Sequence, residues 1–176
     1  MRKLLVVIAL VLCAAPVLAQ DDAGTDLVKG YNLGEMGTLA NLVALELGTI
    51  QDLAAPLGEI TDENYEAGVI TDDNVFEAQL VLAYVMWRCQ FMIKPVCSAG
   101  LGEEAFTDPG LVEFKAEGQA VLGDVVALVD TFLAAGDADA FAAAAAFAEG
   151  ITEQDLINRL YSLSDGALAA VGLTEL

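Results

Sequence analysis

The stretch from Asp73 to Lys94 reads DNVFEAQLVLAYVMWRCQFMIK, and Pro95 follows it directly. On a helix its residues are apolar on nearly every side. Its two charged interior residues, Glu77 and Arg88, are eleven positions apart and so lie about three helical turns from each other on one line. A helix that is apolar all round is typically surrounded by other helices. The stretch therefore predicts a central, buried helix that ends at Pro95.

The chain begins MRKLLVVIALVLCAAPVLAQ, with two basic residues, an apolar run, and small residues at positions 17 and 19. This order is typical of a secretory signal peptide cleaved after Ala19. An uncleaved membrane anchor is the alternative, but the run has only about sixteen residues and acidic residues follow it. We therefore expect a signal peptide over residues 1–19, one acidic domain over residues 20–176, and a periplasmic or secreted protein.

The chain is strongly acidic, with 27 Asp and Glu against seven Lys and Arg. Cleavage would remove two basic residues and no acid, leaving five against 27, a net charge of −22. Such an excess argues against nucleic acid or an anionic membrane as a partner, because phosphate binding depends on clustered Lys and Arg. A self-repelling, soluble surface explains the charge more simply than a dedicated cation-binding role does.

Two cysteines, Cys89 and Cys97, remain after the expected cleavage. An even number of cysteines in an oxidising compartment predicts a structural disulfide between them. A redox-active pair is the alternative, but the CxxC spacing typical of such pairs is absent.

Apolar residues spaced by three, four or seven predict a first helix over roughly residues 25–53, ended by Pro56 and Gly58. Its first half contains three glycines, Gly30, Gly34 and Gly37. Each weakens a helix by about 1 kcal/mol relative to Ala, so either the chain breaks there or another helix approaches closely. We expect a kink or a non-helical opening before Thr38.

A short pattern of Ile, Thr and acidic residues occurs three times, centred on Thr61, Thr71 and Thr152. Each Thr is predicted to cap the N-terminus of a helix, and the acids behind it lie where the helix dipole favours negative charge. The acids around the first two copies could also suggest calcium, but the EF-hand spacing is absent. We expect helix caps and no metal site.

The second half of the chain carries three further helical patterns, over about residues 108–136, 139–147 and 153–171. The first is the clearest amphipathic pattern in the sequence, and no convincing strand-like alternation occurs anywhere. Together these segments predict an all-α, single-domain bundle of four main helices plus one or two short ones.

Arg88 is the residue of most interest, because a charge in apolar surroundings is costly unless it is paired. A carboxylate from a neighbouring helix is the expected partner. The alternative is a ligand-binding site formed by Arg88 and Tyr84, which lies one turn earlier on the same face. Only ten residues separate Glu77 from Arg88, too few for a membrane span.

The chain contains no histidine, which removes the commonest general base, the usual zinc ligand and the Ser-His-Asp triad together. Motifs for covalent haem, nucleotide binding and the hydrolase nucleophile elbow are also missing. We therefore expect no enzyme, no catalytic residue and no cofactor. Catalysis by two carboxylates stays formally open.

These features favour a non-catalytic protein that acts in interaction or assembly, through an unidentified protein partner or through self-association. A carrier or sensor of an apolar small molecule bound between helices is the first alternative. A hydrolase that uses only carboxylates is the second.

Overall fold

The computed structural model describes residues 22–100, 112–135 and 140–170. These residues form helices joined by turns, with no strand among them, so the predicted all-α class is confirmed. The predicted signal peptide, residues 1–19, lies outside the described residues. In chain order the helices are α2 (Asp22–Ala54), the 3₁₀ helix η1 (Ala55–Glu59), α3 (Asp62–Glu66), α4 (Asp72–Arg88), the π-helical η2 (Cys89–Ile93), α5 (Lys94–Gly100), α6 (Val112–Ala134), α7 (Ala140–Glu153) and α8 (Leu156–Ala170).

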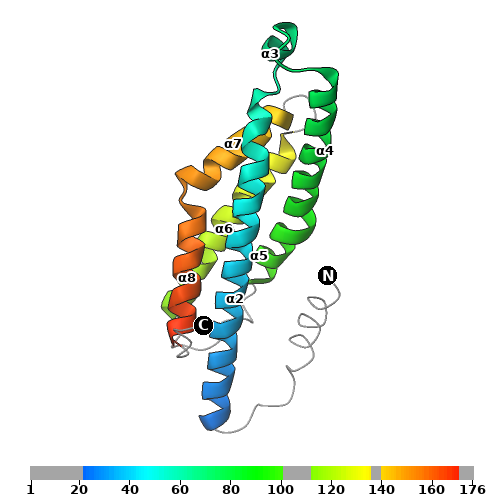
Figure 1. The fold of residues 1–176 in the computed structure, drawn as a ribbon. Coiled ribbons are helices and arrows are strands. Elements are labelled where there is room, and N and C mark those ends of the chain that lie inside the picture. The colour runs from blue at the N-terminus through cyan, green and yellow to red at the C-terminus, as the bar shows by residue number, and fades with distance from the viewer. Residues whose placement is uncertain (1–21, 101–111, 136–139, 171–176) are drawn as a thin grey trace.

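The helix at the centre of the fold is α2. It runs along the long axis of the molecule, with α8 on one side and α4 on the other (Figure 1). It also contacts α5 and α7, while α6 packs against α5, α7 and α8. Its inward residues recur at helical spacing and are buried: Met36, Ala40, Val43, Ala44, Leu47, Ile50 and Ala54.

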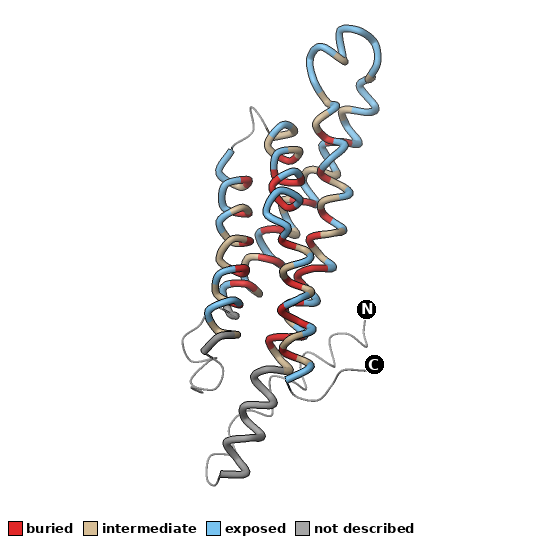
Figure 2. Tube along the Cα trace, turned by 90° about the vertical axis from the view of Figure 1, so that its left-hand side faces the viewer, coloured by how far each residue is buried: buried red, intermediate tan, exposed pale blue. Residues whose placement is uncertain are grey.

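The remaining core comes mainly from the second half of the chain. Buried residues recur at helical intervals where helices face one another, and the turn around α3 is exposed (Figure 2). Phe132 of α6 stacks on Phe147 of α7, with ring centroids 5.0 Å apart. Further fully buried apolar residues are Val121, Val125, Val129, Ile151, Leu156, Leu160 and Leu163.

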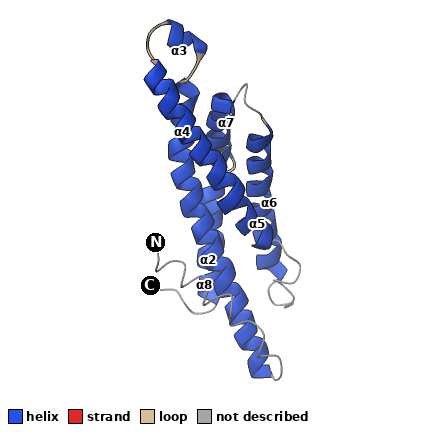
Figure 3. Cartoon of the chain, turned by 90° about the vertical axis from the view of Figure 1, so that its right-hand side faces the viewer, coloured by secondary structure: helices blue, strands red, loops and turns tan. Residues whose placement is uncertain are grey.

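The prediction that the Asp73–Lys94 stretch is surrounded by other helices is wrong. It lies on the outside of the bundle, where Figure 3 shows α4 and α5 along one face. Within α4 only Ala78 and Val85 are buried. A helix that is apolar on every side can be buried on any of them. Its sequence does not show how many other helices will pack against it. Here α2, α6 and α7 contact the stretch and cover one side only.

The predicted helix end at Pro95 is also wrong, since the helix continues without a break from Asp72 to Ser98. Proline normally breaks a helix because it lacks an N–H and its ring clashes with the carbonyl four residues back. The π-helical turn η2 comes just before it, where the Lys94 N–H bonds to the Cys89 carbonyl five residues back. Such wider turns are a known means of accommodating a local disruption within a helix.

The expected break before Thr38 is absent, because α2 is continuous from Asp22 to Ala54. Close approach of another helix accounts for one of the glycines. A Cβ at Gly37 would lie 3.0 Å from Leu168 Cγ and 3.2 Å from the Ser164 carbonyl oxygen, both on α8. At Gly34 a Cβ would meet nothing within 4 Å. Gly37 therefore lets α2 and α8 pack closely, and Gly34 has no such role.

These two glycines make a matched test within one helix. Gly34→Ala should raise the free energy of unfolding by about 0.5–1 kcal/mol, because Ala favours the helix and nothing opposes its methyl group. Gly37→Val should lower it by about 2 kcal/mol, because the larger side chain meets the α8 backbone. Urea denaturation followed by circular dichroism would measure both. Equal effects of the two substitutions would contradict the close α2–α8 packing.

The predicted caps at Thr61 and Thr71 are confirmed. Each hydroxyl accepts a hydrogen bond from the backbone N–H three residues later, and Asn74 bonds back to the Thr71 N–H to complete a capping box. The predicted cap at Thr152 is wrong, because α7 continues through Glu153 and the Thr152 hydroxyl bonds to the Ala148 carbonyl instead. The chain turns at Asp155, which has φ 51°, before α8 begins.

Candidate functional site

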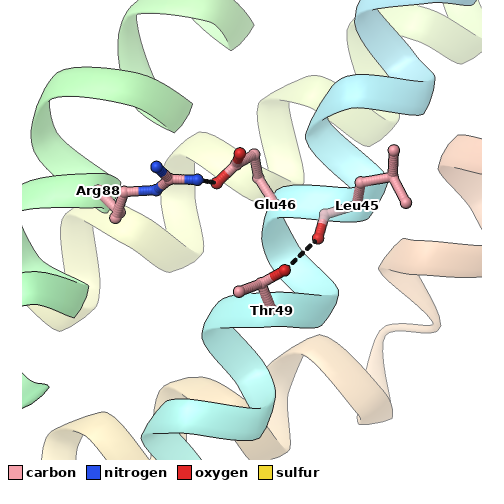
Figure 4. Close-up of polar contacts among 4 residues, drawn as sticks. All are labelled: Leu45, Glu46, Thr49 and Arg88. Carbon is pink, nitrogen blue, oxygen red and sulfur yellow. Dashed lines mark hydrogen bonds and ion pairs between the residues drawn. The ribbon is translucent and has the colours of Figure 1, made fainter. Parts of the chain in front are cut away.

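The predicted pairing of Arg88 is confirmed. Arg88, in the last turn of α4, donates through Nη2 to Glu46 Oε2 on α2 (Figure 4). Both side chains are partly buried, with 19% of Arg88 and 29% of Glu46 exposed. The bond therefore links the outer helix to the central one in an environment where water weakens it only in part.

Tyr84 lies beside this pair, as its spacing predicts. The Arg88 guanidinium carbon is 5.5 Å from the centre of the Tyr84 ring, a distance suited to a cation–π contact. Arg88 Nε is buried and has no hydrogen-bond partner among the described residues. A ligand-binding role for Tyr84 and Arg88 stays a prediction, and any ligand would have to share a guanidinium that Glu46 and Tyr84 already contact.

Two other cations also join helices. Lys94 of α5 pairs with Asp130 of α6 at 2.6 Å, and Arg159 of α8 pairs with Asp124 of α6 at 2.7 Å. These side chains are about one third to one half exposed, so each pair contributes little to stability. Three of the few basic residues therefore lie in contacts between helices.

The structure does not contain the predicted Cys89–Cys97 disulfide, because both thiols are free and buried. The reason is the continuous helix. Eight residues of helix separate two Cα atoms by roughly 12 Å, whereas a disulfide needs them within about 7 Å. The disulfide was plausible only with the chain turning at Pro95, and the helix passes through that residue.

Burial changes the chemistry of these thiols. It raises the pKa of Cys89 to about 12 and that of Cys97 to about 12, from an ordinary value of 9.0. Reactivity requires the thiolate, so at neutral pH both thiols are in the inert form. Their burial, rather than a bond, would keep them reduced in an oxidising compartment.

The raised pKa values of the two thiols predict that the folded protein loses stability at alkaline pH. Between pH 9 and 12 the unfolded chain loses thiol protons that the folded chain retains, so stability present below pH 9 is lost as pH rises towards 12. The double variant Cys89→Ala, Cys97→Ala should lose less stability between pH 8 and pH 10.5 than the parent. Urea denaturation under reducing conditions measures this difference, and tyrosines and lysines common to both proteins cancel. Parallel losses in the two proteins would contradict the burial of the thiols.

One acidic residue at the start of α4, Asp72, makes a local contact with α3. The Tyr65 hydroxyl donates to Asp72 Oδ1 at 2.6 Å, which ties α3 to the start of α4 and raises the pKa of Tyr65. Among the described residues no group of three or more His, Cys, Asp or Glu is placed to hold a metal ion.

Sequence reasoning missed an exposed apolar surface along α4 and η2. We call it the α4 face, and it consists of Phe76, Leu80, Tyr84, Trp87, Phe91 and Met92. The exposed fractions of these side chains range from 38% for Met92 to 61% for Phe76. Trp87 and Phe91 contact each other, with ring centroids 6.3 Å apart. Nothing in the sequence marks this face as exposed, because both sides of the helix carry large apolar residues: Val85 and Ile93 are buried, while Trp87 and Phe91 are exposed.

The helix that carries this face was expected to be too short to span a membrane. In the part of the chain that the structure describes, Asp72–Ser98 is nevertheless long and apolar enough by length and composition, because it does not stop at Pro95. A single helix of this kind is weak evidence for a span. Only 22% of its most apolar 18 residues is buried within the protein.

No protein-family model, curated protein or solved structure matches the chain significantly. The α4 face and the Arg88–Glu46 pair beside it are therefore the basis for a functional assignment.

Proposed function

We propose that the protein is exported as one helical domain and acts, without catalysis, in protein interaction or assembly through the α4 face. The observation that carries this proposal is the exposure of four aromatic side chains and two large aliphatic ones on one side of one helix. Soluble monomers rarely expose contiguous apolar patches of this kind unless something binds there.

The composition of the face supports a protein partner. Aromatic residues and Met are enriched at protein interfaces, and Trp and Tyr are the commonest residues of binding hot spots. The α4 face contains one Trp, one Tyr, two Phe and one Met. The absence of histidine and the neutral state of both thiols support a non-catalytic role.

A photo-crosslinking experiment tests the proposal. A photoreactive phenylalanine derivative would replace Trp87 in one variant and, as the control, Thr131, an exposed residue of α6, in another. Illumination of each variant in its exported location should join position 87 to a polypeptide, and should not join position 131 to the same species. A position 87 that crosslinks to no polypeptide would contradict the proposal.

A further inference from the structure

We propose that the α4 face binds the α4 face of a second copy of this chain, with the two helices antiparallel across a two-fold axis. The inference rests on the proposed interaction function and names its partner. Four observations carry it: the spacing of the face, the charge around it, the charge difference between its ends, and its size.

The spacing of the face is that of a helix-pairing seam. Leu80, Tyr84, Trp87 and Phe91 follow one another by four, three and four residues, the alternation that keeps a line of side chains directed at a neighbouring helix. From Phe76 to Phe91 this line is roughly 22 Å long. It lies opposite Val85, the fully buried residue of α4.

The charge of the chain favours contact between copies here and opposes it elsewhere. Residues 78–102 contain no Asp or Glu, although the chain has 27 acidic residues. The same run contains Arg88 and Lys94, two of the five basic residues outside the expected signal peptide. Two strongly acidic molecules can therefore meet along the α4 face without pressing carboxylates together.

The two ends of the face differ in charge, which selects the antiparallel arrangement. Asp72, Asp73 and Glu77 lie at its N-terminal end, and Lys94 lies beyond its C-terminal end. In a parallel pair the acidic ends would meet. In an antiparallel pair the acidic end of each copy instead meets the end of the other where Lys94 is paired with Asp130, so the two acidic ends stay apart. The helix dipoles also oppose each other.

One register aligns the apolar residues of the two copies and keeps their acidic ends apart. When the axis passes between Ala83 and Tyr84, these two residues lie opposite each other in the two copies. The same register then places Leu80 opposite Trp87, Phe76 opposite Phe91, and Asp73 opposite Lys94. Ala83 is exposed and small, so it allows the helices to approach closely where they cross.

The size of the face fits a small dimer interface. A buried aromatic side chain contributes 150–250 Å², so four half-exposed aromatics with Leu80 and Met92 offer roughly 500 Å² in each copy. A standard interface buries about 800 Å² per partner. The polar residues that flank the face, among them Gln79 and Gln90, are exposed and can supply much of the remainder.

The alternative occupant is a lipid surface, which the face suits less well. Helices that lie in membrane interfaces combine an apolar side with a polar side rich in Lys and Arg. The helix from Asp72 to Ser98 has only Arg88 and Lys94, and both are already paired with acids of neighbouring helices.

Sedimentation velocity of the purified exported chain over a range of concentrations tests the dimer. The parent should form dimers that dissociate on dilution. Trp87→Asp should shift the dissociation constant at least about 100-fold towards monomer, the effect expected for a hot-spot aromatic, while circular dichroism stays unchanged. The control Leu45→Asp, at an exposed position of α2, should leave the dimer intact. A monomeric parent, or equal dissociation by both variants, would overturn the proposal.

Engineered cysteines test the antiparallel register, since the native thiols are buried. Tyr84→Cys lies beside the proposed axis and should form a disulfide between copies on mild oxidation. Phe76→Cys should not pair with itself, but should pair with Phe91→Cys when the two variants are mixed. Efficient self-pairing of Phe76→Cys would overturn the antiparallel arrangement.

Two outcomes separate this inference from the proposed function. A monomeric parent whose position 87 still crosslinks to another polypeptide would defeat the dimer and leave the interaction function standing. A monomeric parent that floats with neutral phosphatidylcholine vesicles, and no longer floats as Trp87→Asp, would defeat both and assign the face to lipid.

Discussion

Leu47→Ala is expected to lower the free energy of unfolding by about 3 kcal/mol, because it empties a fully buried site at the centre of α2. Leu47 is 0% exposed and belongs to the line of α2 residues that faces the other helices. The loss combines the burial of three carbon atoms with the cost of a cavity that the surrounding helices fill only in part. For a domain of this size it corresponds to a fall in Tm of roughly 9 °C.

Two leucine controls make this a test of where the core lies. Leu45→Ala, two residues away on the same helix, removes a side chain that is 56% exposed and should change stability by less than about 0.5 kcal/mol. Leu80→Ala, at a 58% exposed position of α4, should do equally little in protein dilute enough to be monomeric. Urea denaturation of all three variants decides the matter. If Leu80→Ala lowered the free energy of unfolding as much as Leu47→Ala, α4 would be a core helix after all.

The sequence predicted several helix boundaries correctly because local chemistry determines them. Proline at position 56 lies just beyond the end of α2, at the start of η1. Thr61 and Thr71 cap α3 and α4 through bonds to residues three positions away. Such interactions involve only neighbours in the chain, so the pattern of residue types is enough to predict them.

Burial of α4 could not be predicted in the same way, because it depends on distant parts of the chain. Hydrophobicity favoured a central position, but α2 presents a longer inward line and contacts α4, α5, α7 and α8. The π-helical turn before Pro95 could not be predicted from the sequence either. It made two predictions wrong: the helix end at Pro95 and the Cys89–Cys97 disulfide. Once the helix passes Pro95, Cys89 and Cys97 lie too far apart along it to form a disulfide.

The sequence predicted that Arg88 pairs with a carboxylate, but not which carboxylate. A lone arginine in an apolar helix requires a carboxylate, and Glu46 supplies it. Nothing local distinguishes Glu46 from the other 26 acidic residues, since it is 42 positions away and meets Arg88 only after α2 and α4 pack. The α4 face was missed because aromatic residues in an apolar helix are usually core residues. Only the fold shows that none of the described residues covers them.

Arg88→Met is expected to lower the free energy of unfolding by about 2 kcal/mol. Removing one partner of a fully buried ion pair costs about 3–5 kcal/mol, and removing one from the surface costs about 0–1 kcal/mol. The Arg88–Glu46 pair lies between these limits, because 29% of the Glu46 side chain can still reach water. The variant also loses the contact with the Tyr84 ring. Thermal melting at fixed protein concentration should show a fall of roughly 6 °C.

A double-mutant cycle with Glu46→Gln separates the ion pair from the packing of the arginine side chain. If the pair is structural, Glu46→Gln alone should destabilise the protein, and Arg88→Met combined with Glu46→Gln should be more stable than the sum of the two single losses predicts, by about 1–2 kcal/mol. The reason is that the double variant leaves no unpaired charge between α2 and α4. An Arg88→Met variant that melts within a degree or two of the parent would instead indicate that the guanidinium serves a ligand, and Tyr84 and Arg88 would then be the first residues to probe for binding.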